Sequence, residues 1–146
     1  GHAAGETTDS CILYSYDANG DRRIGVGPGG TASATTSTDN LEQFGFRLRN
    51  GQVQMRNGGA PFGCAGGSWQ AVSDPDTAVT RLAFALQETC INVTDTAQPC
   101  ATGAPALLRR SVRIVIEAQV RSNPDIVQHL DTTVSIANDK LVTAYP

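Results

Sequence analysis

The sequence has few of the features that attach a protein to a membrane or to nucleic acid. No run of residues approaches the roughly 18 apolar positions that span a bilayer. Basic residues number 11 against 14 acidic ones, Lys140 is the only lysine, and the formal net charge is −3. Because the arginines are dispersed among acids, no basic patch is visible, and we expect no nucleic-acid partner.

Histidine is also scarce, which excludes most combinations of residues that form catalytic or metal-binding sites. Outside the first two residues, His129 is the only histidine, so a histidine-assisted nucleophile or a multi-histidine metal site would need it. The acids Glu88, Glu117 and Asp131 fall on separate segments, and nothing local brings two of them together for glycoside chemistry. We therefore expect no catalytic residues and no enzyme activity.

The chain has 146 residues, which is enough for one domain. Gly1 and His2 are typical of the scar left by tag cleavage, and residues 3–9 form a polar lead-in, so we expect the native protein to extend upstream. We divide the chain into a scar and lead-in (residues 1–10) and a single domain (residues 11–146).

Four cysteines, Cys11, Cys64, Cys90 and Cys100, lack the CxxC spacing of zinc ribbons and allow three disulfide pairings. A local bridge between Cys90 and Cys100 would close a short ring and contribute about 3 kcal/mol. The remaining bridge, between Cys11 and Cys64, would contribute about 4 kcal/mol. Disulfides indicate the periplasm, the cell surface or secretion. The alternative is four reduced thiols buried as small apolar groups.

Alternation of apolar and polar residues predicts antiparallel hairpins. Residues 112–120 and 130–136 both alternate, and the turn formers of residues 122–125 lie between them. Residues 44–48 and 53–55 flank Asn50 and Gly51, the strongest short hairpin signal. Residues 25–40 are rich in Gly, Ser and Thr and predict a long surface loop.

Residues 74–93 allow two interpretations. Ser73 and Asp74 are suited to cap a helix, on which Val79, Leu82 and Leu86 would share one face. In the strand interpretation, which we favour, Leu82 and Leu86 alternate with smaller residues and the run continues into strand-forming residues up to 93.

An acidic turn follows the first predicted strand. Asp17, Asn19 and Asp21 occupy positions 1, 3 and 5 of an EF-hand-like loop, which makes them candidate calcium ligands. Arg22 replaces the glycine required at position 6, and Pro28 stands where a bidentate acid belongs. The alternative is an Asx-type turn that binds no metal.

Seven short sequence features follow one another along the chain: CILYSYD (11–17), NGD (19–21), FGFRLRNG (44–51), Trp69, SDP (73–75), VTRLAF (79–84) and TVSIAN (133–138). Their order resembles that in the globular head of type IV minor pilins and of type II secretion minor pseudopilins, particularly the PilW-like and J-like prepilins. Ala137 departs from the pattern, because an arginine often stands there in the family.

The resemblance implies an α+β, strand-dominated pilin-like head that is not an enzyme and requires no cofactor. It implies an inner-membrane anchor formed by an N-terminal helix, a periplasmic head, and later a place in a pilus or pseudopilus at the cell surface. The partners would be other minor subunits and the major subunit, contacted to prime or cap the filament. We expect the loops at residues 25–40 and 57–67 to make such contacts.

The alternative function is a secreted or surface binding module that depends on calcium and is directed to sugars. It would use Asp17, Asn19 and Asp21 as calcium ligands and would expose Trp69 in a concave site. A lone tryptophan beside a glycine loop is otherwise a core anchor.

Overall fold

The computed structural model describes residues 6–16, 42–58 and 61–146, and the chain forms two compact units. Unit 1 comprises Gly1–Ala83 and Ile116–Leu130, and unit 2 comprises Phe84–Val115 and Asp131–Pro146. Three strands contribute residues to both units, so this division does not test the single domain expected over residues 11–146.

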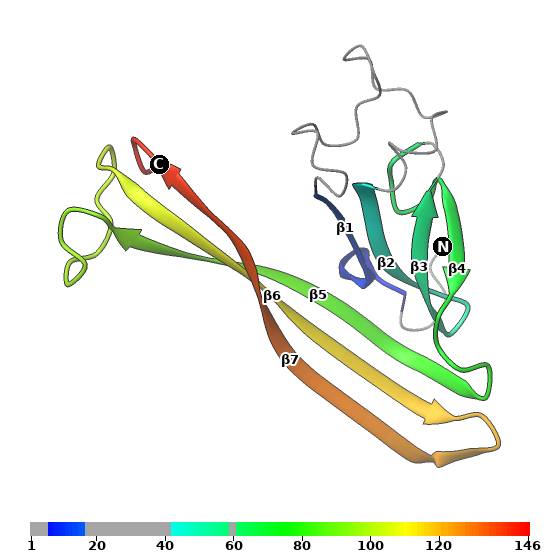
Figure 1. Ribbon diagram of the computed structural model, residues 1–146. Coiled ribbons are helices and arrows are strands. Elements are labelled where there is room, and N and C mark those ends of the chain that lie inside the picture. Colours follow the sequence, from blue (N-terminus) through cyan, green and yellow to red (C-terminus); the bar gives the residue numbers. More distant parts are fainter. Residues whose placement is uncertain (1–5, 17–41, 59–60) are drawn as a thin grey trace. The chain divides into compact units, whose positions relative to one another are not determined.

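Unit 1 contains a four-stranded antiparallel sheet in which neighbours in sequence are neighbours in space (Figure 1). A single turn of 3-10 helix, η1 (Thr8–Ser10), leads into it. The strands are β1 (Cys11–Ser15), β2 (Gln43–Arg49), β3 (Gln52–Gly58) and β4 (Ser68–Ala71).

The hairpin between β2 and β3 turns at Asn50 and Gly51, as the sequence predicts. Both residues have positive φ, 52° and 69°, which is the geometry of the two-residue turn that matches strand twist. The Asn50 amide donates a 2.7 Å hydrogen bond to Oε1 of the buried Glu6. Glu6 therefore ties the described end of the lead-in, residues 6–10, to this turn of the sheet.

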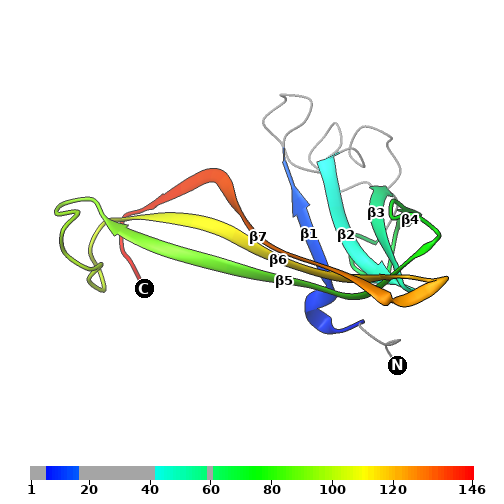
Figure 2. The same cartoon turned by 90° about the horizontal axis from the view of Figure 1, so that it is seen from below.

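The second sheet has the order β5-β6-β7 (Figure 2). Its strands are β5 (Thr77–Asn92), β6 (Ala106–Val120) and β7 (Asn123–Val142). The strand interpretation of residues 74–93 is confirmed over β5. Asp74 forms a turn instead of a helix cap: its Oδ1 accepts from the Asp76 amide at 2.7 Å and its carbonyl from the Thr77 amide at 3.1 Å.

The hairpin between β6 and β7 exists as predicted, but its turn lies earlier than residues 122–125. β6 ends at Val120 and β7 begins at Asn123. Arg121 explains the shift, since its amide donates to the Asp76 carbonyl at 2.9 Å and its Nε to the Pro75 carbonyl at 2.8 Å. These bonds place the corner at Arg121 and Ser122, and Pro124 is left in the edge strand β7, where proline is tolerated.

The α+β class is the part of the fold prediction that needs correction. Within the described residues, helix is limited to the 3-10 turn η1 and to Glu42, which also has 3-10 geometry, so this part of the chain is strand-dominated with almost no helix. The strand-dominated architecture and the two disulfides are as expected, and the structure pairs Cys11 with Cys64 and Cys90 with Cys100. No helix in the described ranges is long and apolar enough to cross a membrane.

Each unit has a small apolar core of its own. Leu48, Val79 and Leu82 are buried in unit 1, and three apolar residues of β6 are buried in unit 2. Arginines of β6 in unit 2 pair with acids on the neighbouring strands, and these pairs are exposed, so each contributes little to stability. They are Arg110 with Glu88, Arg113 with Asp131, and Arg109 with Asp139.

Candidate functional site

The strand register divides the four-stranded sheet into two chemically different faces. Residues directly opposite each other in antiparallel strands point to the same side of the sheet. One side, the charged face, carries all three arginines of the four strands and consists of Cys11, Leu13, Ser15, Gln43, Gly45, Arg47, Arg49, Gln52, Gln54, Arg56, Trp69 and Ala71. The other, the aromatic face, has no charged strand residue and consists of Ile12, Tyr14, Phe44, Phe46, Leu48, Val53, Met55 and Gln70.

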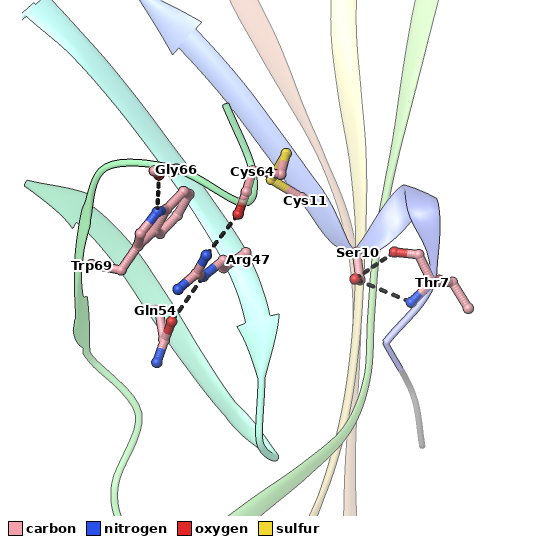
Figure 3. The surroundings of a disulfide bond; sticks show 8 residues. All are labelled: Thr7, Ser10, Cys11, Arg47, Gln54, Cys64, Gly66 and Trp69. Atoms are coloured by element: carbon pink, nitrogen blue, oxygen red, sulfur yellow. Dashed lines mark hydrogen bonds between the residues drawn. A yellow bond between two sulfur atoms is a disulfide. The ribbon is translucent and has the colours of Figure 1, made fainter. Parts of the chain in front are cut away.

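The charged face is fastened to the loop at residues 61–67, which we call the disulfide loop (Figure 3). The Cys11–Cys64 bridge, with 6.1 Å between the Cα atoms, links β1 to this loop. Arg47 adds a second attachment, because its Nη1 donates to the Cys64 carbonyl at 2.6 Å while its Nε donates to Gln54 Oε1 at 2.8 Å. The loop therefore has both a covalent and a hydrogen-bonded tie to the sheet.

Trp69 belongs to this packed arrangement. Its Nε1 donates to the Gly66 carbonyl at 2.7 Å, and the Arg47 guanidinium lies 4.3 Å from the ring centroid, in cation–π geometry. Gly45 leaves room for the ring, since a Cβ there would lie 3.2 Å from Trp69 Cη2. Figure 3 shows the indole beside Arg47 and beneath the Gly66 segment. In the described structure Trp69 therefore acts as a packing anchor.

Arg56 is the largest fully buried side chain in the described chain, with 1% of its surface exposed. Its Nη1 donates to the Gln43 carbonyl at 2.8 Å, and its guanidinium lies 5.1 Å from the ring centroid of Phe62 in the disulfide loop. Burial lowers the pKa of Arg56 from its ordinary value. A second cation therefore connects the sheet to this loop.

The aromatic face carries a row of stacked rings. Tyr16, just after β1, stacks on Phe44 with 4.7 Å between ring centroids, and Tyr14 lies 5.6 Å from Phe44 and 6.5 Å from Phe46. Tyr14 and Tyr16 are 41% and 49% exposed, and Met55 beside them is also exposed. Burial, followed by the neighbouring Tyr16, raises the pKa of Tyr14. The row is an uncharged, partly exposed apolar surface, the type of surface that marks interaction sites.

A pocket of about 410 Å³ lies where the lead-in, β2 and the disulfide loop meet in unit 1. Its volume falls within the roughly 300 to 1,000 Å³ of ligand sites. The lining combines two cations, one buried carboxylate, three hydroxyls and the disulfide, from Glu6, Thr7, Thr8, Ser10, Cys11, Arg47, Leu48, Arg49, Cys64 and Ala65.

The candidate calcium ligands Asp17, Asn19 and Asp21 lie outside the described residues, as do residues 25–40. Among the residues that are described, no group of three or more His, Cys, Asp or Glu side chains is arranged to hold a metal ion.

Each of the acids considered for glycoside chemistry contacts a basic side chain. Glu117 lies 3.2 Å from Arg81 and 3.8 Å from Nδ1 of the exposed His129. Glu88 and Asp131 contact the arginines of β6 described above.

The sequence interpretation missed the two faces of the first sheet and the role of Glu6. The faces were detectable, because Ile12, Tyr14, Phe44 and Phe46 occupy alternate positions in residues 11–16 and 43–49 while the arginines take the positions between. Glu6 gave no such signal, since its partner Asn50 is 44 residues away.

The two sheets and two disulfides define a disulfide-bonded β protein. The family model of prepilin peptidase-dependent protein B (PpdB) matches residues 1–136. The chain therefore belongs to this family, which links it to the type IV pilin and prepilin-processing system. No curated protein and no solved structure gives a significant match.

Proposed function

We propose that the chain is the head of a minor pilin or pseudopilin, a non-enzymatic subunit that primes or caps a type IV pilus or a type II secretion pseudopilus. The observation that carries this proposal is the exposed part of the aromatic face, at Tyr14, Tyr16 and Met55. Exposed rings without any charged strand residue among them suit an apolar protein partner, because burying them requires no charge to be desolvated.

The same surface suggests how the head meets the rest of the filament. An apolar helix is a good occupant for a flat uncharged sheet face, since each element must bury its hydrophobic side against another. We propose that the aromatic face packs against such helices, either the one expected upstream of residue 1 or those of other minor subunits and the major subunit. In this proposal the helix anchors the precursor in the inner membrane, with the head in the periplasm, before assembly at the cell surface.

Two experiments test the proposal. The first is mass spectrometry of the native N-terminus from the membrane and sheared-filament fractions of the source cell. A methylated residue leading an apolar helix of about 20 residues, the length that spans a bilayer, supports a processed pilin-type subunit. A start produced by ordinary signal-peptide cleavage refutes it.

The second experiment tests the aromatic face. Changing Tyr14 and Tyr16 together to Ser should abolish co-purification of the native protein with other filament subunits. Phe62→Ser is the matched control, because Phe62 is similarly exposed but lies in the disulfide loop, which is tied to the charged face. If both variants retain their partners equally, the aromatic face is not the contact surface.

A further inference from the structure

The pocket between the lead-in, β2 and the disulfide loop has an unbalanced charge. Two arginines and one carboxylate line it. Arg49 is paired with Glu6 at 3.6 Å, while its side chain remains 54% exposed. Arg47 has no carboxylate within ion-pair distance among the described residues, and its hydrogen-bond acceptors are the neutral Gln54 and the Cys64 carbonyl. The lining therefore has one cation in excess of its anions.

Arg47 is also held in a position from which it cannot easily leave. Its guanidinium is fixed by two hydrogen bonds and by the ring of Trp69, and its Nη2 donates no hydrogen bond to any described residue. Burial and the nearby Arg49 lower the pKa of Arg47, while Glu6 partly opposes them. A fixed guanidinium that is partly desolvated and has a spare donor favours an anionic ligand.

The composition of the lining selects a singly charged, planar anion. Glu6 is buried and paired with Arg49, so a doubly charged phosphate would meet this carboxylate while finding only one excess cation. A carboxylate needs one balancing charge and matches the fork of a guanidinium. Ala65 and the Cys11–Cys64 disulfide add an apolar wall suited to the aliphatic stem of a side chain. One of the hydroxyl groups that line the pocket already has a hydrogen-bond partner within the lead-in, because Ser10 Oγ donates to the Thr7 carbonyl at 2.6 Å.

We propose that this pocket binds an acidic side chain, glutamate or aspartate, of a partner polypeptide, with Arg47 as the unpaired cation that holds the carboxylate and Arg49 as the second contact. This site is distinct from the aromatic face. It deepens the proposed function, on which it rests, by naming the chemistry through which a partner subunit is recognised.

The test begins with a probe, using the disulfide-bonded 146-residue chain. The peptide acetyl-Ala-Glu-Ala-amide should shift the NMR signals of the Arg47 and Arg49 Nε–H groups and of the Thr8 amide. The matched peptide with Gln in place of Glu should not. Equal shifts with both peptides, or none with either, would overturn the proposal. Tighter binding of inorganic phosphate at the same signals would overturn the preference for a carboxylate.

Variants separate a binding role from a structural one because they act in opposite directions. Arg49→Gln should weaken binding of the Glu peptide about tenfold or more, as expected for loss of a charge-assisted contact. Glu6→Gln should strengthen it, since it removes the competing carboxylate and keeps an oxygen to accept from Asn50. Arg109→Gln, a surface arginine of unit 2 paired with Asp139, should change nothing. If Arg49→Gln and Glu6→Gln weaken binding alike, the arginines act only in folding and the proposal fails.

A last measurement links the pocket to assembly. Native protein with Arg49→Gln should capture fewer filament subunits than the wild type. If peptide binding is lost while capture is unchanged, the pocket is not a partner site and this inference is wrong, although the proposed function stands. If the wild type captures no filament subunit, the proposed function itself fails, whatever the peptide does.

Discussion

Gly45→Ala should destabilise the protein much more than Gly63→Ala, a change of the same kind in the disulfide loop. A Cβ at Gly45 would lie 2.8 Å from the Ile12 carbonyl oxygen, 2.8 Å from Leu13 Cδ2 and 3.2 Å from Trp69 Cη2. The first of these atoms belongs to the backbone of β1, so it cannot relieve the clash by a side-chain rotation. Overpacking of this kind costs about 1 to 3 kcal/mol.

The matched control is Gly63→Ala. A Cβ at Gly63 meets no atom within 4 Å, so its free energy of unfolding should stay within about 0.5 kcal/mol of the wild type. Urea unfolding followed by fluorescence measures both variants, because Trp69 is the only tryptophan and lies beside Gly45. Gly45→Ala should also alter the native emission. Equal unfolding midpoints for the two variants would refute the reasoning and with it the close approach of β1, β2 and Trp69.

Three further predictions concern stability. Replacing Cys11 and Cys64 by Ser should cost about 4 kcal/mol in the chain-entropy model, given a sequence separation of 53; a loss under 1 kcal/mol in denaturant titration would contradict it. Glu6→Ala leaves the Asn50 amide without this acceptor and should cost about 1 to 3 kcal/mol, whereas Glu6→Gln should cost less. Folding raises the pKa of Tyr14, so above about pH 10 the unfolded state loses its proton first and stability falls as pH rises. Tyr14→Phe should lessen that fall in alkaline melts, and an unchanged slope would count against it.

The hairpins were predictable because their signals are local. Asn50 and Gly51 favour a two-residue turn whatever surrounds them, and alternation identified β6 and β7. The helix alternative for residues 74–93 failed because Asp74 uses its cap chemistry within a turn. The position of the next turn depended on Arg121 contacting Pro75, 46 residues away, which no local pattern contains.

The candidate site also has one part that the sequence could predict and one part that it could not. The alternation of aromatic residues and arginines in β1 and β2 was visible in the sequence, although its meaning depends on which strands pair. The pocket was not predictable, since it joins Glu6, Arg49 and Cys64 from three separate segments. Long-range side-chain contacts of this kind appear only once the register and the disulfide are known.

The separation of charge in the first sheet gives the protein two sides of different chemistry. A sheet with the same chemistry on both sides presents the same surface when it is turned over. Here one side is tied to a disulfide-bonded loop and carries arginines, and the other offers uncharged rings. A neighbour that fits one side is mismatched to the other, so in the proposed filament role a reversed copy would lose contacts on both sides and the stack would have a defined direction.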